Sequence, residues 1–463
     1  MTPALTELFV RQSLSDAGFP PDVAAAYRDL LRDAHEALDD GAVPPDGRRV
    51  WIVPGRIEVL GKHVDYAGGR SLLCTVERGM VLVARPRADR QVVLRDARRR
   101  EATTLSLDAP ARGAIPWTVY PRTVMQRLGR NFGTMVQGAD FALASNLSPA
   151  AGVSSSSALT VGLTLAFAAL CDLPSHPDWA QAITNRAALA GYVGALENGG
   201  SFGVLSGERG VGTMGGAQDQ TAILCSEPGR LDVFSWAPVH YERSVAWPAT
   251  YAFVVGVSGV VASKTGGARD RYNRAARTAH HLVDAWNVVA DAAGRPRART
   301  LKEAFVAAAD GAPLREVPAA LTTAAEARAT AEFPAHHLVA RLGQFFDETF
   351  VLVPGAADAL QALDLARFGR LVDQSQAGAE RALENQIAET VHLQRYAREL
   401  GADAASAFGA GFGGSVWAMV PVTEAEAFAA RWRERYLRAH RTAAHRAQFF
   451  TTAPGPPAFE VIG

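Results

Sequence analysis

The sequence is poor in the features that mark several large classes of protein. Its 463 residues include only three cysteines, Cys74, Cys171 and Cys225, with no metal-ligand spacing. We therefore expect no disulfide framework and a reducing, cytoplasmic environment. Lys+Arg and Asp+Glu both count 47, and without a basic excess no nucleic-acid partner is expected. The longest apolar run, Leu159 to Leu173, is too short and too polar to span a membrane, and the N-terminus lacks the pattern of a secretory signal.

What the chain does have is length and apolar content enough for more than one core. Hydrophobic residues make up 48% of it, so two domains are expected. Between 237 and 248 the composition shifts to Trp, Pro and polar residues, which places a boundary near 230 and divides the chain into 1–230 and 231–463. Strands and helices interleave without a regular βαβ rhythm, which favours an α+β fold.

Hydrophobic periodicity predicts the individual elements. Two short runs, Met80 to Ala84 and Gln91 to Leu94, flank a charged turn and are interpreted as a hairpin. Arg95 to Arg100 is interpreted as a solvated basic turn. The other predicted strands are 49–53, 141–147, 251–257, 415–420 and 447–451, and the main predicted helices are 5–40, 117–128, 156–173, 184–196, 269–292, 318–331, 386–400 and 423–440.

A run of four serines, within the serine segment Pro149 to Leu159, is the strongest local signal of a binding site. It follows a predicted strand and opens a predicted helix, and it contains Gly152 and Ser154 to Ser157. Free N–H groups at a helix N-terminus attract negative charge, and small side chains let a polyphosphate approach the backbone. Simple helix capping would explain one serine. Four serines after a glycine favour a phosphate site.

Two common nucleotide-binding templates do not fit. Gly55 to Lys62 has one residue too many between its glycines for a P-loop and no Ser or Thr after the lysine. Gly409-Ala-Gly411 enters a predicted strand rather than a helix, so it does not open a dinucleotide-binding βαβ unit.

The first motif, Pro54 to Gly69, places charged side chains between glycines. It keeps the Arg, Gly, His, Asp, Tyr, Gly, Gly of the galactokinase signature Gly-Arg-Val-Asn-Leu-Ile-Gly-Glu-His-Thr-Asp-Tyr-Asn-Gly-Gly. The serine segment is similar to Gly-Leu-Ser-Ser-Ser-Ala of the same family, the Asp219 segment (Met214 to Gln220) to Gly-Ile-Met-Asp-Gln, and the glycine motif (Phe408 to Gly414) to Gly-Gly-Gly-Phe-Gly-Gly. In these motifs and in their order, the chain resembles the GHMP small-molecule kinases, whose architecture has two domains with the active site between them.

This resemblance implies a role for each matching residue. Asp219 matches the carboxylate that takes a proton from the anomeric hydroxyl of a sugar, and Arg56 matches the arginine beside it, which favours the ionised carboxylate. A loose phosphoryl transition state needs positioning and charge stabilisation more than a strong base. His63 and Asp65 match residues that hydrogen-bond the sugar, and Gly216 is expected beside them.

The cofactors implied are ATP and Mg²⁺. Gly152, Ser154, Ser155, Ser156 and Ser157 are expected around the phosphates.

Ser156 is the expected serine ligand of the metal, with Glu197 as the second ligand; Glu208, in a long insertion, is the alternative. Pro116 to Tyr120 resembles a family segment beside the adenine, which implies nucleotide contacts for Trp117 and Tyr120.

The first motif also departs from the family. Lys62 replaces the glutamate that meets the C6 hydroxyl of galactose, and Glu58 replaces an asparagine. One hypothesis is that Lys62 binds an acidic or extended C6 group, a charge-assisted bond of about 1.5–3 kcal/mol. The alternative is that Lys62 pairs with Glu58 or reaches solvent. No tyrosine stands where the family has one near the sugar; Arg269 is close to that place.

The resulting prediction is an ATP-dependent, galactokinase-like sugar kinase that forms a sugar 1-phosphate. A kinase for galacturonate, arabinose or a heptose, a non-catalytic sugar and nucleotide sensor, and a decarboxylase on the same fold are the alternatives.

Overall fold

The larger of two β-sheets carries the first motif. The computed structural model describes residues 12–38, 47–108, 116–148, 152–260 and 267–461. Strands of the larger sheet run in the order β12-β1-β2-β5-β3-β4, and β6 pairs with β2 and with β7. Their bounds are β1 Arg49–Leu60, β2 Arg70–Pro86, β3 Gln91–Asp96, β4 Glu101–Ser106, β5 Ala139–Ser145, β6 Arg230–Ser235, β7 His240–Ala246 and β12 Phe459–Val461.

Strand β1 is longer than the sequence pattern predicts, and it runs on from Val53 into the first motif. Every residue from Val50 to Leu60 is buried. Because side chains alternate between the faces of a strand, Arg56 and Glu58 belong to the same face. The charged residues of the first motif are therefore held by a sheet rather than by a loop.

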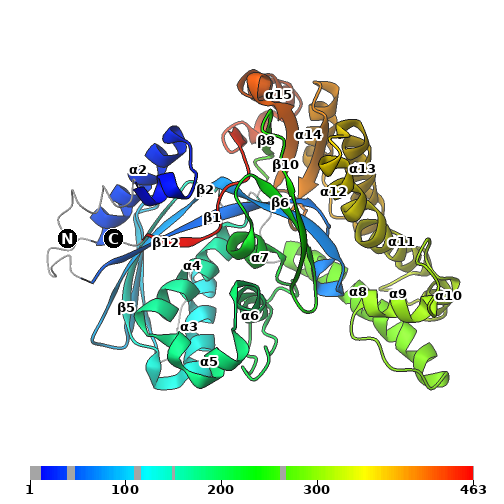
Figure 1. The fold of residues 1–463 in the computed structure, drawn as a ribbon, viewed down its shortest axis with the longest axis horizontal. Helices are drawn as coiled ribbons and strands as arrows, with labels where there is room; N and C mark the ends of the chain where they lie inside the picture. The colour runs from blue at the N-terminus through cyan, green and yellow to red at the C-terminus, as the bar shows by residue number, and fades with distance from the viewer. Residues whose placement is uncertain (1–11, 39–46, 109–115, 149–151, 261–266, 462–463) are drawn as a thin grey trace.

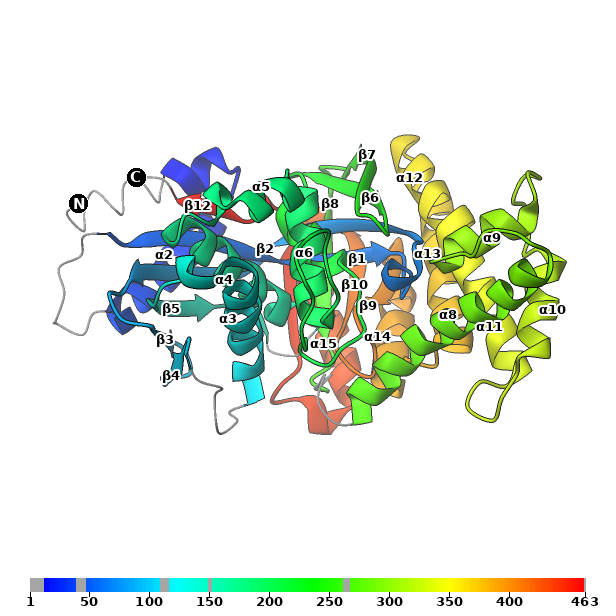
Figure 2. The ribbon, with the colours of Figure 1, turned by 90° about the horizontal axis from the view of Figure 1, so that it is seen from below.

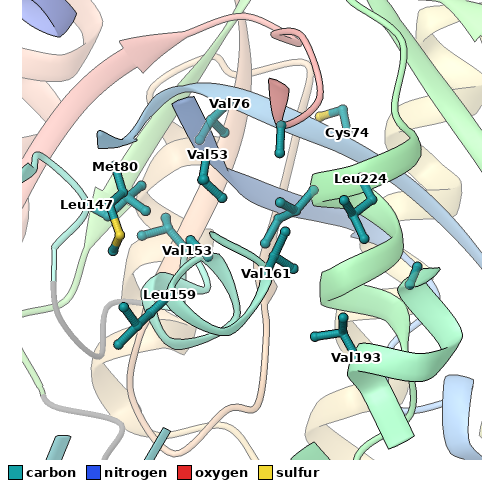
Figure 3. Packing of buried hydrophobic residues seen from close by; sticks show 14 of the residues in the cluster. Val53, Cys74, Val76, Met80, Leu147, Val153, Leu159, Val161, Val193 and Leu224 are labelled. Carbon is teal, nitrogen blue, oxygen red and sulfur yellow. The ribbon is translucent and has the colours of Figure 1, made fainter. Parts of the chain in front are cut away.

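Helices cover both faces of the larger sheet, which explains why its central strands are apolar on both sides (Figure 1). Val50 and Ile52 pack in one cluster with α2, whereas Trp51 and Val53 belong to the cluster that contains α4. Around the serine segment, Val153 and Leu159 lie beside Met80 and Leu147 (Figure 3). The helices of this half are α2 Pro21–Leu38, α3 Val119–Phe132, α4 Ser155–Leu170, α5 Pro177–Ala182, α6 Arg186–Asn198 and α7 Gln218–Cys225.

The predicted hairpin between Met80 to Ala84 and Gln91 to Leu94 is wrong. Strand β5 pairs with β2 on one side and, in parallel, with β3 on the other. A strand that is distant in the sequence thus separates two neighbours, which no local turn signal reveals.

The smaller sheet is antiparallel, in the order β11-β8-β10-β9. Its two faces again alternate along a strand: Val416 and Ala418 pack with α14 and α15, and Trp417 and Met419 face α12 and α13. The bounds are β8 Tyr251–Val257, β9 Ala404–Phe408, β10 Ser415–Pro421, β11 Gln448–Thr452, α12 Val353–Gln361, α13 Leu365–Gly378, α14 Ala388–Glu399 and α15 Ala425–Ala439.

A group of four helices forms the end of the molecule opposite α2 and β12 (Figure 2). These are α8 Gly267–Ala292, α9 Leu301–Ala309, α10 Ala319–Ala327 and α11 Ala335–Phe346. They share a core around Trp286, Phe305 and Phe345, which also includes Val64 and Ala67 of the first motif. The helices of the second half therefore support the motif of the first half directly.

Sheet membership refines the division of the chain. Strands β6 and β7 belong to the larger sheet, the smaller sheet begins with β8 at Tyr251, and β12 returns to pair with β1. We propose a boundary between 246 and 251, rather than near 230, with the last residues returning to the first domain. The mixture of sheets and helices confirms the α+β class. None of the helices in the described ranges is long and apolar enough to cross a membrane.

Candidate active site

A cavity of about 530 Å³ lies where the predicted motifs meet. Its walls come from β1 and the first motif, the start of α4, the end of α6, the Asp219 segment, α8 and the glycine motif. Segments far apart in the sequence thus form one site. The predicted residues that line the cavity are Arg56, Glu58, His63, Asp65, Trp117, Tyr120, Gly152, Ser154, Ser155, Ser156, Glu197, Gly216 and Asp219.

Asp219 is held through both of its carboxylate oxygens. The Nε and Nη2 atoms of Arg56 lie 2.8 and 2.7 Å from Asp219 Oδ1. The hydroxyl of Ser154 donates to Asp219 Oδ2 at 2.6 Å, and that of Ser157 does so at 3.3 Å. The Asp219 side chain keeps 18% of its surface exposed, against 4% for Arg56. The carboxylate is therefore fixed by β1 and α4 and still reachable from the cavity.

The serine segment reaches the cavity as a helix N-terminus. Helix α4 begins at Ser155, and Ser154 before it is left-handed, with φ 59° and ψ 41°. Ser155 and Ser156 line the cavity. Ser157 is fully buried and is not part of the cavity wall, so its expected place around the phosphates stays a prediction. Its hydroxyl instead supports Asp219.

The glycine motif lies directly against the serine segment. A Cβ atom on Gly409 would sit 3.2 Å from the carbonyl oxygen of Gly152, and one on Gly152 would sit 3.3 Å from the carbonyl oxygen of Phe408. Both glycines also have positive φ, of 82° and 78°. Only residues without a Cβ suit this contact, which closes one side of the cavity.

His63 contributes a neutral ring to the cavity wall, in contact with the glycine motif. Its Nε2 lies 3.2 Å from the carbonyl oxygen of Ala410, which can only accept, and its Nδ1 lies 3.0 Å from the hydroxyl of Tyr66. Burial, and then the neighbouring Arg341, lower the pKa of His63 to about 4. His63 is thus uncharged near neutral pH, with both nitrogens in defined roles.

Asp65 lies beside Asp219 and is held by backbone N–H groups. Its Oδ1 accepts from Tyr66 at 2.9 Å and its Oδ2 from Gln218 at 3.3 Å. Burial, and then the neighbouring Asp219, raise the pKa of Asp65 to about 6. A Cβ on Gly216 would lie only 2.6 Å from Asp65 Oδ2, so Gly216 is the residue that leaves room for this carboxylate.

The expectation that Lys62 faces the sugar is corrected. Lys62 is 1% exposed and is not part of the cavity wall. Its ammonium donates to Ser375 Oγ at 2.8 Å, and Ser375 donates to Glu348. The alternative also differs from the structure, because the side chain of Lys62 is buried and its hydrogen-bond partner is Ser375 rather than Glu58 or solvent.

Glu58 does reach the cavity wall, in an unusual protonation state. Its Oε2 accepts from Gln218 Nε2 at 2.5 Å. Burial raises the pKa of Glu58 to about 8, although Lys62 and Arg56 act to lower it. This hydrogen bond holds Gln218, the residue directly before Asp219, against strand β1.

Ser156 and Glu197 both line the cavity, whereas Glu208 does not. Glu197 is 6% exposed, and its Oε1 accepts from Thr160 at 2.6 Å. A hydroxyl and a carboxylate are hard oxygen ligands of the kind Mg²⁺ takes, with waters and phosphates completing its shell. Within the described ranges, no group of three or more His, Cys, Asp and Glu side chains could form an all-protein cage. The residues present fit a magnesium ion carried by a nucleotide.

The sequence interpretation missed several wall residues. Arg98 and Arg99, taken as a solvated turn, line the cavity together with Trp117 and Tyr120. Arg98 also pairs with Asp33 of α2 at 2.7 Å. No sequence signal marks this contact, because β3 is placed by its pairing with the distant strand β5, and β4 is placed by its pairing with β3.

Tyr272 was also missed. It comes from the first turns of α8, and its ring lies 5.3 Å from that of His63. It lines the cavity, whereas Arg269, the residue expected near the place of a family tyrosine, packs against Gly212 outside it. The sequence does contain a tyrosine near the expected place, because Tyr272 follows Arg269 by three residues, which is about one helical turn.

Comparisons with known proteins agree with this geometry. The galactokinase galactose-binding signature matches residues 40–86, the GHMP kinases N terminal domain residues 119–227, and the GHMP kinases C terminal domain residues 356–438. These three matches appear in the family order and contain the first motif, the serine segment and Asp219. The chain belongs to the GHMP kinases.

Within that class it is similar to galactokinases. The galactokinase of Roseiflexus sp. strain RS-1 is 27% identical over 376 residues, which is 81% of this chain and 84% of that protein. The galactokinase of Lactiplantibacillus plantarum is 32% identical over 134 residues, 28% of this chain and 33% of that protein. The crystal structure of Lactococcus lactis galactokinase complexed with galactose has the same fold, with a TM-score of 0.73, 21% identity, and coverage of 93% of this chain and 99% of that one.

Proposed function

We propose that this protein is an ATP-dependent sugar kinase that phosphorylates the anomeric hydroxyl of a neutral, galactose-like monosaccharide. The observation that carries the proposal is the Asp219 carboxylate, held by Arg56 and Ser154 at the N-terminus of α4 on the wall of a large cavity. The galactose-binding signature over residues 40–86 supports the choice of sugar class.

The chemistry assigned to the protein is proton transfer and charge stabilisation. Asp219 accepts the proton of the sugar hydroxyl as its oxygen bonds to the γ-phosphorus of ATP. The bond from that phosphorus to the bridging oxygen of ADP breaks, and ADP leaves with the electron pair. Arg56, beside both Asp219 and the Gly152 carbonyl, lies where it stabilises charge on the transferring group.

The charges on the cavity wall favour a neutral sugar over a uronate. Asp65 and Asp219 are on that wall beside Glu58, whose raised pKa keeps it protonated near neutral pH, and Lys62 is not on it. An acidic C6 group would therefore meet carboxylates without the cation that the uronate hypothesis requires. His63 and Asp65 are proposed to bind sugar hydroxyls, with Tyr272 as a further wall.

We assign the nucleotide to the serine side of the cavity. The N–H groups at the start of α4 suit the phosphates, with Gly152 allowing close approach. Trp117 and Tyr120 are proposed to flank the adenine, and Ser156 and Glu197 to hold Mg²⁺, which would neutralise phosphate charge when bound. The three cysteines are free thiols, which supports a reducing, cytoplasmic environment.

Sugar-dependent ADP release is the experiment that tests the proposal. The purified protein is mixed with ATP, Mg²⁺ and a panel of galactose, glucose, arabinose, galacturonate and a heptose, and ADP is measured. We expect the highest kcat/KM with galactose and the product galactose 1-phosphate. Binding of both ligands without ADP release would instead identify a sensor, and a preference for galacturonate would restore the uronate hypothesis.

A further inference from the structure

A second, smaller cavity lies behind the glycine motif, between α8 and α11. It has a volume of about 60 Å³, and its wall includes Arg271, Arg274, His337, Arg341, Glu384 and Phe412. Phe412 faces this cavity, while its neighbours Gly411 and Gly413 line the larger one. A positive φ of 59° at Phe412 accompanies this change of direction. The small cavity is thus distinct from the proposed sugar and nucleotide site.

Positive charge dominates the wall of the small cavity. Three arginines line it, against one carboxylate, Glu384. Glu384 lies 3.4 Å from Arg274 and 3.8 Å from His337, and its side chain is 58% exposed. Arg271 lies over the ring of Phe412 at 4.8 Å and makes no ion pair with another described residue. One partly exposed carboxylate does not balance three guanidinium groups.

Arg341 supplies the buried donor. It is 1% exposed, its Nη1 donates to Gln344, and its Nη2 donates to the carbonyl oxygen of His63. Its Nε–H has no hydrogen-bond partner in the described structure. Leaving a buried guanidinium donor without a hydrogen bond is destabilising and therefore costs free energy. An acceptor from outside the chain would remove that cost.

We infer that this small cavity is a binding site for a phosphate group. A tetrahedral oxyanion offers acceptors in several directions, which matches donors converging from α8 and α11. The volume of about 60 Å³ exceeds what a single water needs and admits the phosphate head but not a nucleotide. Such a site is separate from the sugar-kinase proposal, because its residues lie outside the larger cavity.

The inference is tested by titrating the full-length protein with inorganic phosphate, at an ionic strength held constant with KCl, in a calorimeter. The titration is repeated with saturating ADP, so that phosphate bound at the serine segment is displaced. We expect a phosphate site that persists with ADP. Binding that disappears completely when ADP is added would assign the phosphate to the larger cavity and overturn the inference.

Substitutions of charged wall residues test whether phosphate affinity follows the charge of the small cavity. Arg274→Gln and Arg271→Gln should each weaken phosphate binding by about 3- to 30-fold, because each removes a partly screened charge-assisted bond. Glu384→Gln should strengthen it a few-fold, because it removes the only carboxylate of the described cavity wall. Arg277→Gln is the matched control, since Arg277 is on the same helix but pairs with Glu332 on the surface. Equal affinity in all four variants would overturn the inference.

Titration with a small phosphate ester distinguishes free phosphate from a phosphate monoester as the ligand. Glycerol 3-phosphate is titrated in parallel with inorganic phosphate, in the same variants. Tighter binding of inorganic phosphate assigns the free ion, and tighter binding of the ester assigns a phosphate monoester whose remainder extends out of the cavity. Each pattern supports the site provided that Arg274→Gln weakens it. Melting temperatures measured without phosphate verify that the variants are folded.

Discussion

The first motif contributes residues to two charged clusters, which differ in their surroundings. We call the cluster of Arg56 and Asp219 the open cluster and that of Lys62, Ser375 and Glu348 the sealed cluster. In one, Arg56 and Asp219 form an ion pair on the wall of the large cavity, and 18% of the Asp219 side chain is exposed. In the other, Lys62, Ser375 and Glu348 form a chain of polar contacts sealed between the first motif and the helices of the second half. The first cluster is reachable from the cavity, where we propose that the substrate binds, and the second joins the two halves of the molecule.

The difference shows that position in a motif does not by itself determine a role. The turn at Gly61 separates the two clusters: its φ is 99°, and a Cβ there would sit 2.4 Å from Ser71 Oγ. The N–H of Gly61 donates to Glu348 at 2.9 Å, which brings this carboxylate to the start of the turn. Lys62 then follows toward Glu348 and Ser375, away from the cavity.

The largest expected effect breaks the open cluster. Asp219→Asn keeps the shape of the side chain and removes its basic oxygen, so kcat should fall by about 10²–10⁴-fold. Steady-state ADP release measures kcat, and calorimetry measures sugar affinity, which should change much less. Asp358→Asn is the control, because Asp358 pairs with Arg243 on the surface. A kcat within about threefold of the wild type would remove Asp219 from the role of base.

The second largest expected effect is a loss of stability when the sealed cluster is broken. Lys62→Met removes the cation between Glu58 and Glu348, and loss of one partner from a buried charged network costs about 3–5 kcal/mol. Urea unfolding should show this loss in the free energy of unfolding. Lys302→Met makes the same chemical change at a half-buried lysine near Arg70 and Glu242, and it should cost far less.

The double variant Lys62→Met/Glu348→Gln sharpens the result, because it removes a carboxylate together with its cation. We expect it to recover a large part of the lost stability. The ratio of kcat/KM for galactose and galacturonate should stay the same in folded Lys62→Met enzyme. A selective loss of galacturonate turnover, on the order of 10- to 100-fold, would show that Lys62 meets the sugar after all.

The open cluster could be predicted from the sequence much better than the sealed one. Arg56, Asp219 and the serine segment are local motifs whose chemistry is visible in their residue types, and the structure brings them together. Lys62 meets Ser375, which lies 313 positions away and has no motif of its own. The sequence shows the unusual lysine but not the partner that holds it.

The same distinction applies to the fold. Strand Tyr251–Val257 and helix α8 follow from local periodicity, and they agree with the prediction to within two residues. The β2–β3 hairpin failed because β5 pairs between the two strands, and Tyr272 reaches the cavity only because α8 packs beside the first motif. Long-range pairing decides these features, and local patterns carry no record of it.

A third prediction tests how closely Gly216 packs against Asp65, the carboxylate beside the open cluster. Gly216→Ala places a methyl group 2.6 Å from Asp65 Oδ2, so Asp65 must shift. We expect the KM for sugar to rise about tenfold with a smaller change in kcat, since a displaced hydrogen-bonding group is worth about 1–3 kcal/mol. Gly343→Ala, in α11 and with no atom within 4 Å of the new methyl, is the control and should leave KM unchanged. An unchanged KM in Gly216→Ala would mean that Asp65 does not bind the sugar.

The smallest expected effect concerns the carboxyl proton of Glu58, which lies between Arg56 and Lys62 in the sequence. Glu58 interacts electrostatically with Arg56 of one cluster and with Lys62 and Glu348 of the other, and burial raises its pKa from 4.5 to about 8. Between these pH values the unfolded chain has released the proton while the folded protein keeps it, so this contribution to stability is complete below pH 4.5 and is lost as the pH rises to 8. Glu58→Gln removes the dependence. Its free energy of unfolding should therefore gain on that of the wild type by about 1 kcal/mol or more between pH 5 and 8, while Glu424→Gln, at an exposed glutamate, should track the wild type. A difference that stays constant across this range, or that changes in the opposite direction, would show that Glu58 is ionised in the folded protein and that Lys62 and Arg56 outweigh its burial.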